Sequence, residues 1–262
     1  MRKYLSIFII TLQEAFSYRL NFVMWRVRQV FVFLIPFFIW RAVLGSSDDI
    51  YGYNFERIMT YLFGTTVLRS LVMGSRTVDL GWMINSGYLT ITLLKPVKNF
   101  SFMFVRDLGD KLYNLSFIAF EIPLMLWLFR PPVFLQSDPV TILLAICSVI
   151  LAIYIYFYIN ILFGSIAFWS RDVWAPRFFL MVILEFATGA MLPLDMLPSW
   201  LQSVIGVTPF PHLLYTPLKV YLGELPSPLV SLSMQVMWVT ILYLLAKYVW
   251  REGLKRYEAE GR

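Results

Sequence analysis

Six apolar runs, each long enough to cross or nearly cross a bilayer, recur from one end of the chain to the other. They cover residues 27–45, 58–74, 112–129, 140–168, 178–194 and 229–249. A helix needs about 20 mostly apolar residues to cross a hydrocarbon core of about 30 Å. Hydrophobic residues occupy 59% of the 262 positions and charged residues only 15%, against about 25% charged in soluble domains. The sequence therefore predicts an all-α membrane protein with six transmembrane helices, forming a single transmembrane domain over residues 1–262.

The basic residues predict how these helices are oriented. Of the 22 Lys and Arg residues, 17 lie before the first run, between the second and third, after the fourth and after the sixth, counting the adjoining ends of the runs, and the alternate connections counted in the same way hold 4. Cytoplasmic connections of membrane proteins are enriched in Lys and Arg, so both termini are predicted to be cytoplasmic. The formal charge of +6 is spread between apolar runs and does not form one basic face, so we expect a lipid bilayer and no nucleic acid as partner.

Three segments outside the runs have their own expected structure. Residues 1–19 hold about nine consecutive apolar positions after a basic start, too few to cross, so they predict a mature interfacial helix. Residues 75–111 predict a long cytoplasmic loop. Residues 195–228 predict an external re-entrant segment of short helices, because an apolar, proline-rich stretch is poorly suited to free water. This region, counted from Pro193, carries seven of the 14 prolines.

The residue types that enzymes use are sparse in this sequence. His212 is the only histidine and Cys147 the only cysteine, so no cluster with zinc-ligand spacing can form. The Gly-x-x-x-x-Gly-Lys-Ser/Thr loop that binds nucleotide phosphates does not occur. We therefore expect no catalytic residue, no metal and no cofactor bound by this chain. An enzyme acting on lipid would need more polar residues converging within the runs.

Two carboxylates near the middle of apolar runs stand out. Glu121 and Glu185 have apolar neighbours on both sides, and a charged group at bilayer depth costs roughly 2.5–3.5 kcal/mol. Each either packs in a protonated or hydrogen-bonded form or belongs to a substrate pathway, for which Asn160 is a further candidate. Arg69 and Lys247 lie near the predicted cytoplasmic ends of their runs, where they can extend to the membrane surface without a functional role.

Short motifs in order along nearly the whole chain carry a resemblance to a known family. They are FSYRLNF (16–22), WR (40–41), YGY (51–53), MTYL (59–62), LLKPV (93–97), AFW (167–169), LPSWL (197–201), PF (209–210), YLG (221–223) and RYE (256–258). Together these resemble the six-span permeases of type 2 ABC exporters, in the branch of about 260 residues with a separate ATPase. The Glu-Arg-x-x-Gly-Thr form of the family's coupling loop is absent, and Asn85-Ser86-Gly87 stands in its place.

The resemblance implies partners, an energy source and a location. It implies a second six-span permease, identical or homologous, and two copies of a cytoplasmic P-loop ATPase that bind ATP and Mg. The cargo implied is a hydrophobic, drug-like or lipid-like compound, exported across a bacterial plasma (inner) membrane by a multi-pass protein. The alternative is an ion-coupled secondary transporter or channel that uses Glu121 and Glu185.

The expected coupling site lies between residues 79 and 97. Large apolar side chains alternate there with small polar ones, and a soluble loop would not usually expose so many of them. Either the membrane surface covers them or they insert into a groove of the ATPase. The residues expected to couple to the ATPase are Asp79, Trp82, Met83, Ile84, Asn85, Gly87, Leu94 and Pro96.

Overall fold

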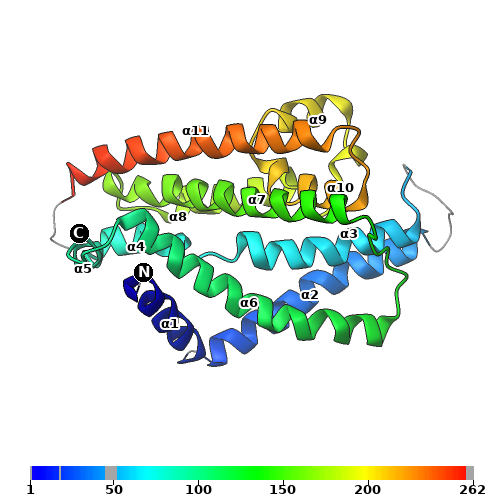
Figure 1. Cartoon of the computed structure of the whole chain (residues 1–262), viewed down its shortest axis with the longest axis horizontal. Coiled ribbons are helices and arrows are strands. Elements are labelled where there is room, and N and C mark those ends of the chain that lie inside the picture. Colours follow the sequence, from blue (N-terminus) through cyan, green and yellow to red (C-terminus); the bar gives the residue numbers. More distant parts are fainter. Residues whose placement is uncertain (1, 18, 45–51, 258–262) are drawn as a thin grey trace.

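The computed structural model describes residues 2–17, 19–44 and 52–257, and every regular element within these ranges is helical. The long helices lie side by side along one axis (Figure 1). Three of them are long and apolar enough to cross a membrane: α6 (Asn99–Phe129), α7 (Pro139–Ser165) with its 3-10 extension η3 (Ile166–Phe168), and α11 (Pro228–Leu254). The all-α membrane class is confirmed. The full set of six spans remains a prediction.

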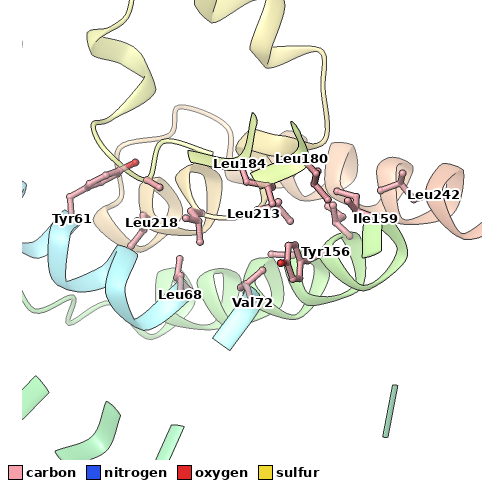
Figure 2. Packing of buried hydrophobic residues seen from close by; sticks show 14 of the residues in the cluster. Tyr61, Leu68, Val72, Tyr156, Ile159, Leu180, Leu184, Leu213, Leu218 and Leu242 are labelled. Atoms are coloured by element: carbon pink, nitrogen blue, oxygen red, sulfur yellow. The ribbon is translucent and has the colours of Figure 1, made fainter. Parts of the chain in front are cut away.

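Helix α7 forms the centre of the molecule. The Asp138 carboxylate caps its first turn by accepting the Thr141 backbone N–H at 2.9 Å, and Pro139 occupies the first position, where no N–H is needed. Ala152 and Ile155 on this helix are fully buried. Figure 2 shows the surrounding cluster, in which side chains of α7 meet those of α3, α8, α11 and the external segment. The longest apolar run is thus the core helix against which the others pack.

The first two runs form helices that pack against each other. Helix α2 (Arg19–Leu44) contains an apolar stretch over Val30–Leu44 with Pro36 inside it. Helix α3 (Phe55–Leu68) begins after Asn54, whose side chain accepts the Arg57 N–H at 2.9 Å. It continues directly into a π-helical turn, η1 (Arg69–Met73), closed by a bond from the Gly74 N–H to the Arg69 carbonyl. A π turn inside a helix is uncommon and often marks a functional site.

The helix that contains the third run is longer than the sequence predicted. Helix α6 begins at Asn99 and not near residue 112, so the connection predicted to be cytoplasmic ends before residue 99. Charged residues at 106–111 interrupt the apolar run and led to the late boundary. The helix continues through them because they form ion pairs with neighbouring elements, among them Asp110 with Arg76 at 2.8 Å. Those pairs offset the loss of hydration that the sequence pattern could not account for.

The fifth run forms a shorter helix than expected. Helix α8 (Trp174–Ala187) has 14 residues, about 21 Å at 1.5 Å per residue, which is less than the hydrocarbon core. The chain then turns at Gly189, whose φ of +77° is a conformation that favours glycine. Residues 188–194, which the sequence assigned to the span, form this turn and the start of η4 (Leu194–Met196).

The segments outside the long helices gather at two opposite ends of the bundle (Figure 1). At one end lie α1 (Arg2–Ser17), α4 (Leu80–Asn85), α5 (Leu89–Leu93) and the last turns of α11. At the other lie α9 (Ser199–Gly206) and α10 (Tyr215–Leu222), so the short helices predicted for the external segment are confirmed. Helix α10 packs back against α7 and α3. Asp48, Asp49, Tyr51 and residues 258–262 lie outside the described residues.

Candidate functional site

An ion pair joins the π turn to helix α8, with the Arg69 side chain 19% exposed and that of Glu185 47% exposed. Both terminal nitrogens of the Arg69 guanidinium donate to the Glu185 carboxylate, with Nη1 to Oε1 at 3.0 Å and Nη2 to Oε2. Arg69 opens η1, and Glu185 lies in the last turn of α8. This two-point geometry is the strong form of the Arg–carboxylate interaction. The prediction that Arg69 only extends to the membrane surface is wrong, because its guanidinium forms an ion pair with Glu185 of the same chain.

The Arg69–Glu185 pair forms part of the lining of two adjoining cavities. The first has a volume of about 530 Å³ and is otherwise lined by apolar and Thr side chains of α2, α3 and the end of α8. The second has a volume of about 280 Å³ and is more polar. Its described lining includes Arg28, Ser70, Asn114, Tyr156 and Arg177. The ion pair thus lies between an apolar compartment and a basic one.

A third cavity, of about 270 Å³, continues toward helix α4. It shares Val78 and Arg177 with the second cavity, and its lining also includes Asp79, Trp82 and Asn160. The Arg177 guanidinium donates to the Val78 carbonyl, which ties α8 to the segment leading into α4. The three cavities therefore form a series from the space between α2 and the end of α8 to helix α4.

The structure separates the three residues predicted for a substrate pathway. Glu185 lines the first two cavities and Asn160 the third, where its amide also donates to the Tyr156 carbonyl at 2.8 Å. Glu121 is half-buried on α6 and lines none of the three cavities. The geometry thus places Glu185 and Asn160 on one series of cavities and leaves Glu121 apart from it. Their roles remain predictions.

The residues predicted for coupling divide between an exposed face and a buried one. Trp82 is 61% exposed and Leu94 80% exposed, and the Trp82 ring lies 5.9 Å from that of Tyr88. Met83 and Ile84, in contrast, are buried, and Ile84 packs in a cluster with residues of α6, α7 and α11. The large apolar side chains that can touch a partner directly are Trp82, Tyr88, Ile91 and Leu94, which we define as the exposed face. Met83 and Ile84 can act only by holding α4 in place.

The remaining coupling residues lie at the edges of these short helices. Asp79 and Pro96 are exposed. The Asn85 amide donates to the Arg171 carbonyl at 2.9 Å, which connects α4 to the segment before α8. Gly87 has a φ of +74°, as the turn between α4 and α5 requires.

A tyrosine that the sequence did not single out fixes this turn from the C-terminal side. The Tyr257 hydroxyl donates to the Gly87 carbonyl at 3.1 Å and accepts the Thr90 N–H at 3.2 Å. The residues after α11 are therefore attached to the exposed face through its turn. Tyr257 falls within the RYE motif of the C-terminal tail, which was the only signal available.

A charged network joins α1 and α6 to the segment that follows η1. Arg76 pairs with Glu14 of α1 at 2.5 Å and with Asp110 of α6 at 2.8 Å. One helical turn further, Lys111 pairs with Asp107 at 3.2 Å, and both side chains are at least 95% buried. The Lys111 ammonium also donates to the carbonyls of Val72 and Gly74, at 3.1 and 2.7 Å. This lysine thus fixes the end of the π turn to α6.

A second charged cluster closes the opposite end of the bundle. Buried Lys219 of α10 pairs with Asp195 at 2.7 Å and with Glu224 at 2.5 Å. The Tyr53 hydroxyl donates to Asp195, and burial together with Asp195 raises the pKa of this phenol well above its usual range. Asp195, Lys219 and Glu224 belong to the predicted external segment, so a lysine and two carboxylates in an apolar stretch were the signal for this cluster.

His212 is a buried polar residue and not an interfacial one. It is 6% exposed, its Nδ1 lies 3.1 Å from the Thr216 hydroxyl, and its carbonyl accepts the Gln235 amide. Burial lowers its pKa to about 4, so the imidazole is neutral at physiological pH. Within the described residues no group of three or more His, Cys, Asp or Glu side chains could hold a metal ion.

Comparison with models of known protein families gives a match over most of the chain. The family model described as "ABC-2 family transporter protein" matches residues 10–261. No curated protein matches the chain.

Proposed function

The chain belongs to the ABC-2 family of transporter proteins, and on this premise we propose that it is the permease subunit of an ATP-driven exporter, coupled to a separate ATPase. The assignment to the class of ABC transporter permeases rests on the family match over residues 10–261. The series of cavities from the space between α2 and α8 to α4 supports the role, since it runs from a mostly apolar cavity to the helix that we propose as the coupling element. The cargo passes the Arg69–Glu185 pair.

The proposed complex contains four chains. Two P-loop ATPase subunits hold ATP and Mg, which supply the energy, and a second six-span permease, identical or homologous, completes the pathway. The cytoplasmic orientation of α4 and α5 is supported by the Lys and Arg bias of the connections. The location we propose is the bacterial plasma (inner) membrane.

A mechanical route leads from the exposed face to the ion pair. Movement of the ATPase displaces α4, whose start follows η2 (Arg76–Asp79). Val78 in η2 is bound by Arg177 of α8, and η2 is joined to η1 through residues 74 and 75. A displacement of α4 therefore acts on both elements that carry the ion pair, α8 and η1. We propose that it separates Arg69 from Glu185 and joins the first two cavities.

Purification of the chain from its native membrane tests the proposal. We expect a P-loop ATPase subunit to co-purify, and export by the reconstituted complex to require ATP. Export driven by an ion gradient alone, with no ATPase present, would instead support the secondary transporter. That alternative is less favoured because Glu185 is held by Arg69 and Glu121 lies outside the cavities.

The proposed orientation is tested by labelling single cysteines in a variant lacking Cys147. Positions next to Asp48 and Glu224 should react with a membrane-impermeant maleimide added to intact cells. Positions next to Lys98 and Lys255 should react only after the membrane is opened. Reaction of the Lys255 position in intact cells would place the C-terminus outside and overturn the orientation.

A further inference from the structure

The two cavities that share the Arg69–Glu185 pair differ sharply in charge. Apart from that pair, the described lining of the 530 Å³ cavity carries no charged group. The described lining of the 280 Å³ cavity carries three guanidinium groups and one carboxylate, namely those of Arg28, Arg69, Arg177 and Glu185. We propose that together they bind an amphiphile with one anionic head group, its chain in the larger cavity and its head in the smaller.

The larger cavity has the size and lining that an apolar chain requires. Its volume of about 530 Å³ falls in the range of roughly 300–1,000 Å³ seen for small-molecule sites. The walls combine aliphatic and aromatic side chains from α2, α3, α8 and the turn that follows α8. These are Val32, Phe33, Ile35, Pro36, Ile39, Trp40, Leu62, Phe186, Ala190, Met191 and Leu192.

The smaller cavity selects an anion over a cation. Guanidinium groups bind carboxylate and phosphate through paired hydrogen bonds, and Arg69 already holds a carboxylate in this way, that of Glu185. A cationic drug could gain from the aromatic rings of Phe33 and Trp40, but its charge would face three guanidinium groups against one carboxylate. The apolar lining alone would bind an anionic or a cationic amphiphile. The guanidinium groups of the smaller cavity therefore determine the preference for an anion.

Glu185 acts as an internal competitor for the head group. In the structure it occupies Arg69, and an incoming anion must take its place. Arg177 is another guanidinium of this cavity, and it donates to the Val78 carbonyl of η2. Binding of the head therefore acts on the segment that leads to the coupling helices. That the bound amphiphile is cargo rests on the proposed function, but the binding test below does not depend on transport.

The test measures binding to the purified full chain in nanodiscs of zwitterionic phospholipid, without nucleotide. The probes are ω-bromododecanoate, ω-bromododecyltrimethylammonium and ω-bromododecanol, whose bromine quenches nearby tryptophan fluorescence. The part of the quenching lost in Trp40→Phe reports the larger cavity. We expect saturable quenching of Trp40 by the carboxylate at least about tenfold tighter than by the cation or the alcohol.

Two substitutions that break the same ion pair should act in opposite directions. Arg69→Gln should weaken carboxylate binding by about tenfold, as expected for loss of a charge-assisted contact. Glu185→Gln should tighten it severalfold by removing the competitor. Arg177→Gln should weaken binding like Arg69→Gln, whereas Arg251→Gln, at an exposed position on α11, should leave it unchanged. If both Arg69→Gln and Glu185→Gln weaken binding alike, the pair is only structural and the proposal fails.

Competition with inorganic phosphate identifies the source of the anion. Millimolar phosphate should not displace the carboxylate probe, because most of its affinity comes from the chain. Full displacement by phosphate would mean that the site binds small free anions, and equal binding of all three probes would mean that only the apolar cavity is used. Either result would overturn the proposal that the two cavities bind an anionic amphiphile. Failure of ATP-driven export with these binding results intact would overturn the proposed function alone.

Discussion

Replacing Trp82 and Leu94 together by Ala is expected to separate the chain from its ATPase while leaving it folded in the membrane. Both side chains are exposed, at 61% and 80%, so their loss removes little packing within the chain. In protein interfaces a few large apolar anchors carry most of the binding energy, each costing about 2 kcal/mol or more when truncated. Co-purification should fall by at least about tenfold, and ATP hydrolysis should no longer respond to cargo.

Two controls separate this effect from general damage. Trp200→Ala removes a tryptophan of similar exposure, 66%, from α9 at the opposite end, and should leave the ATPase bound. Met83→Ala removes a buried neighbour of Trp82 and should reduce expression instead of specifically reducing binding. If the double variant still binds its ATPase and exports normally, the exposed face lies on lipid and coupling belongs elsewhere, most directly to α1.

Lys111→Met is expected to have the largest effect on stability. The substitution leaves the carboxylate of Asp107, which is fully buried, without its cation, and removes the donor to two carbonyls at the end of η1. Removing one partner of a buried ion pair typically costs about 3–5 kcal/mol. The melting temperature in detergent should therefore fall by on the order of 10 °C. It can be measured from the loss of folded protein on heating.

A second substitution at the partner should recover part of this loss. In Lys111→Met with Asp107→Asn no buried charge remains, while the side chain can still accept from the Thr77 hydroxyl, so the double variant should melt above the single one. Lys255→Met, at an exposed ion pair at the end of α11, should change the melting temperature little. A single Lys111→Met variant as stable as the unchanged chain would show that this pair does not hold η1 to α6.

The long apolar helices could be predicted from the sequence because burial in lipid or protein requires a continuous apolar surface. The runs at 140–168 and 229–249 correspond closely to α7 and α11. The start of α6 could not be predicted, since its charged turns are stabilised by Glu14 and Arg76, which are distant in sequence. The early end of α8 depends on the turn at Gly189, which an apolar run with few charges does not indicate.

The candidate site shows the same division. Glu185 was identified because a carboxylate in an apolar run is costly, but its partner Arg69 was assigned to the membrane surface because pairing across 116 positions leaves no local pattern. The coupling segment was located by its exposed apolar residues. Its two faces could not be told apart, since in helices as short as α4 and α5 the contacts with α6, α7 and α11 decide which side is buried.

In the π turn at Arg69–Met73, the number of residues matters as much as their identity for placing Arg69 next to Glu185. The bond from the Gly74 N–H to the Arg69 carbonyl spans five residues, so the turn holds one residue more than an α-helical turn. Deleting a single residue here would restore the ordinary repeat and rotate one side of the helix by about 100° relative to the other. Since Lys111 holds the far end, the rotation would fall on α3 and carry Arg69 away from Glu185. A one-residue gap at 69–73 in a related chain would therefore mark a transporter without this ion pair, even where every aligned residue is identical.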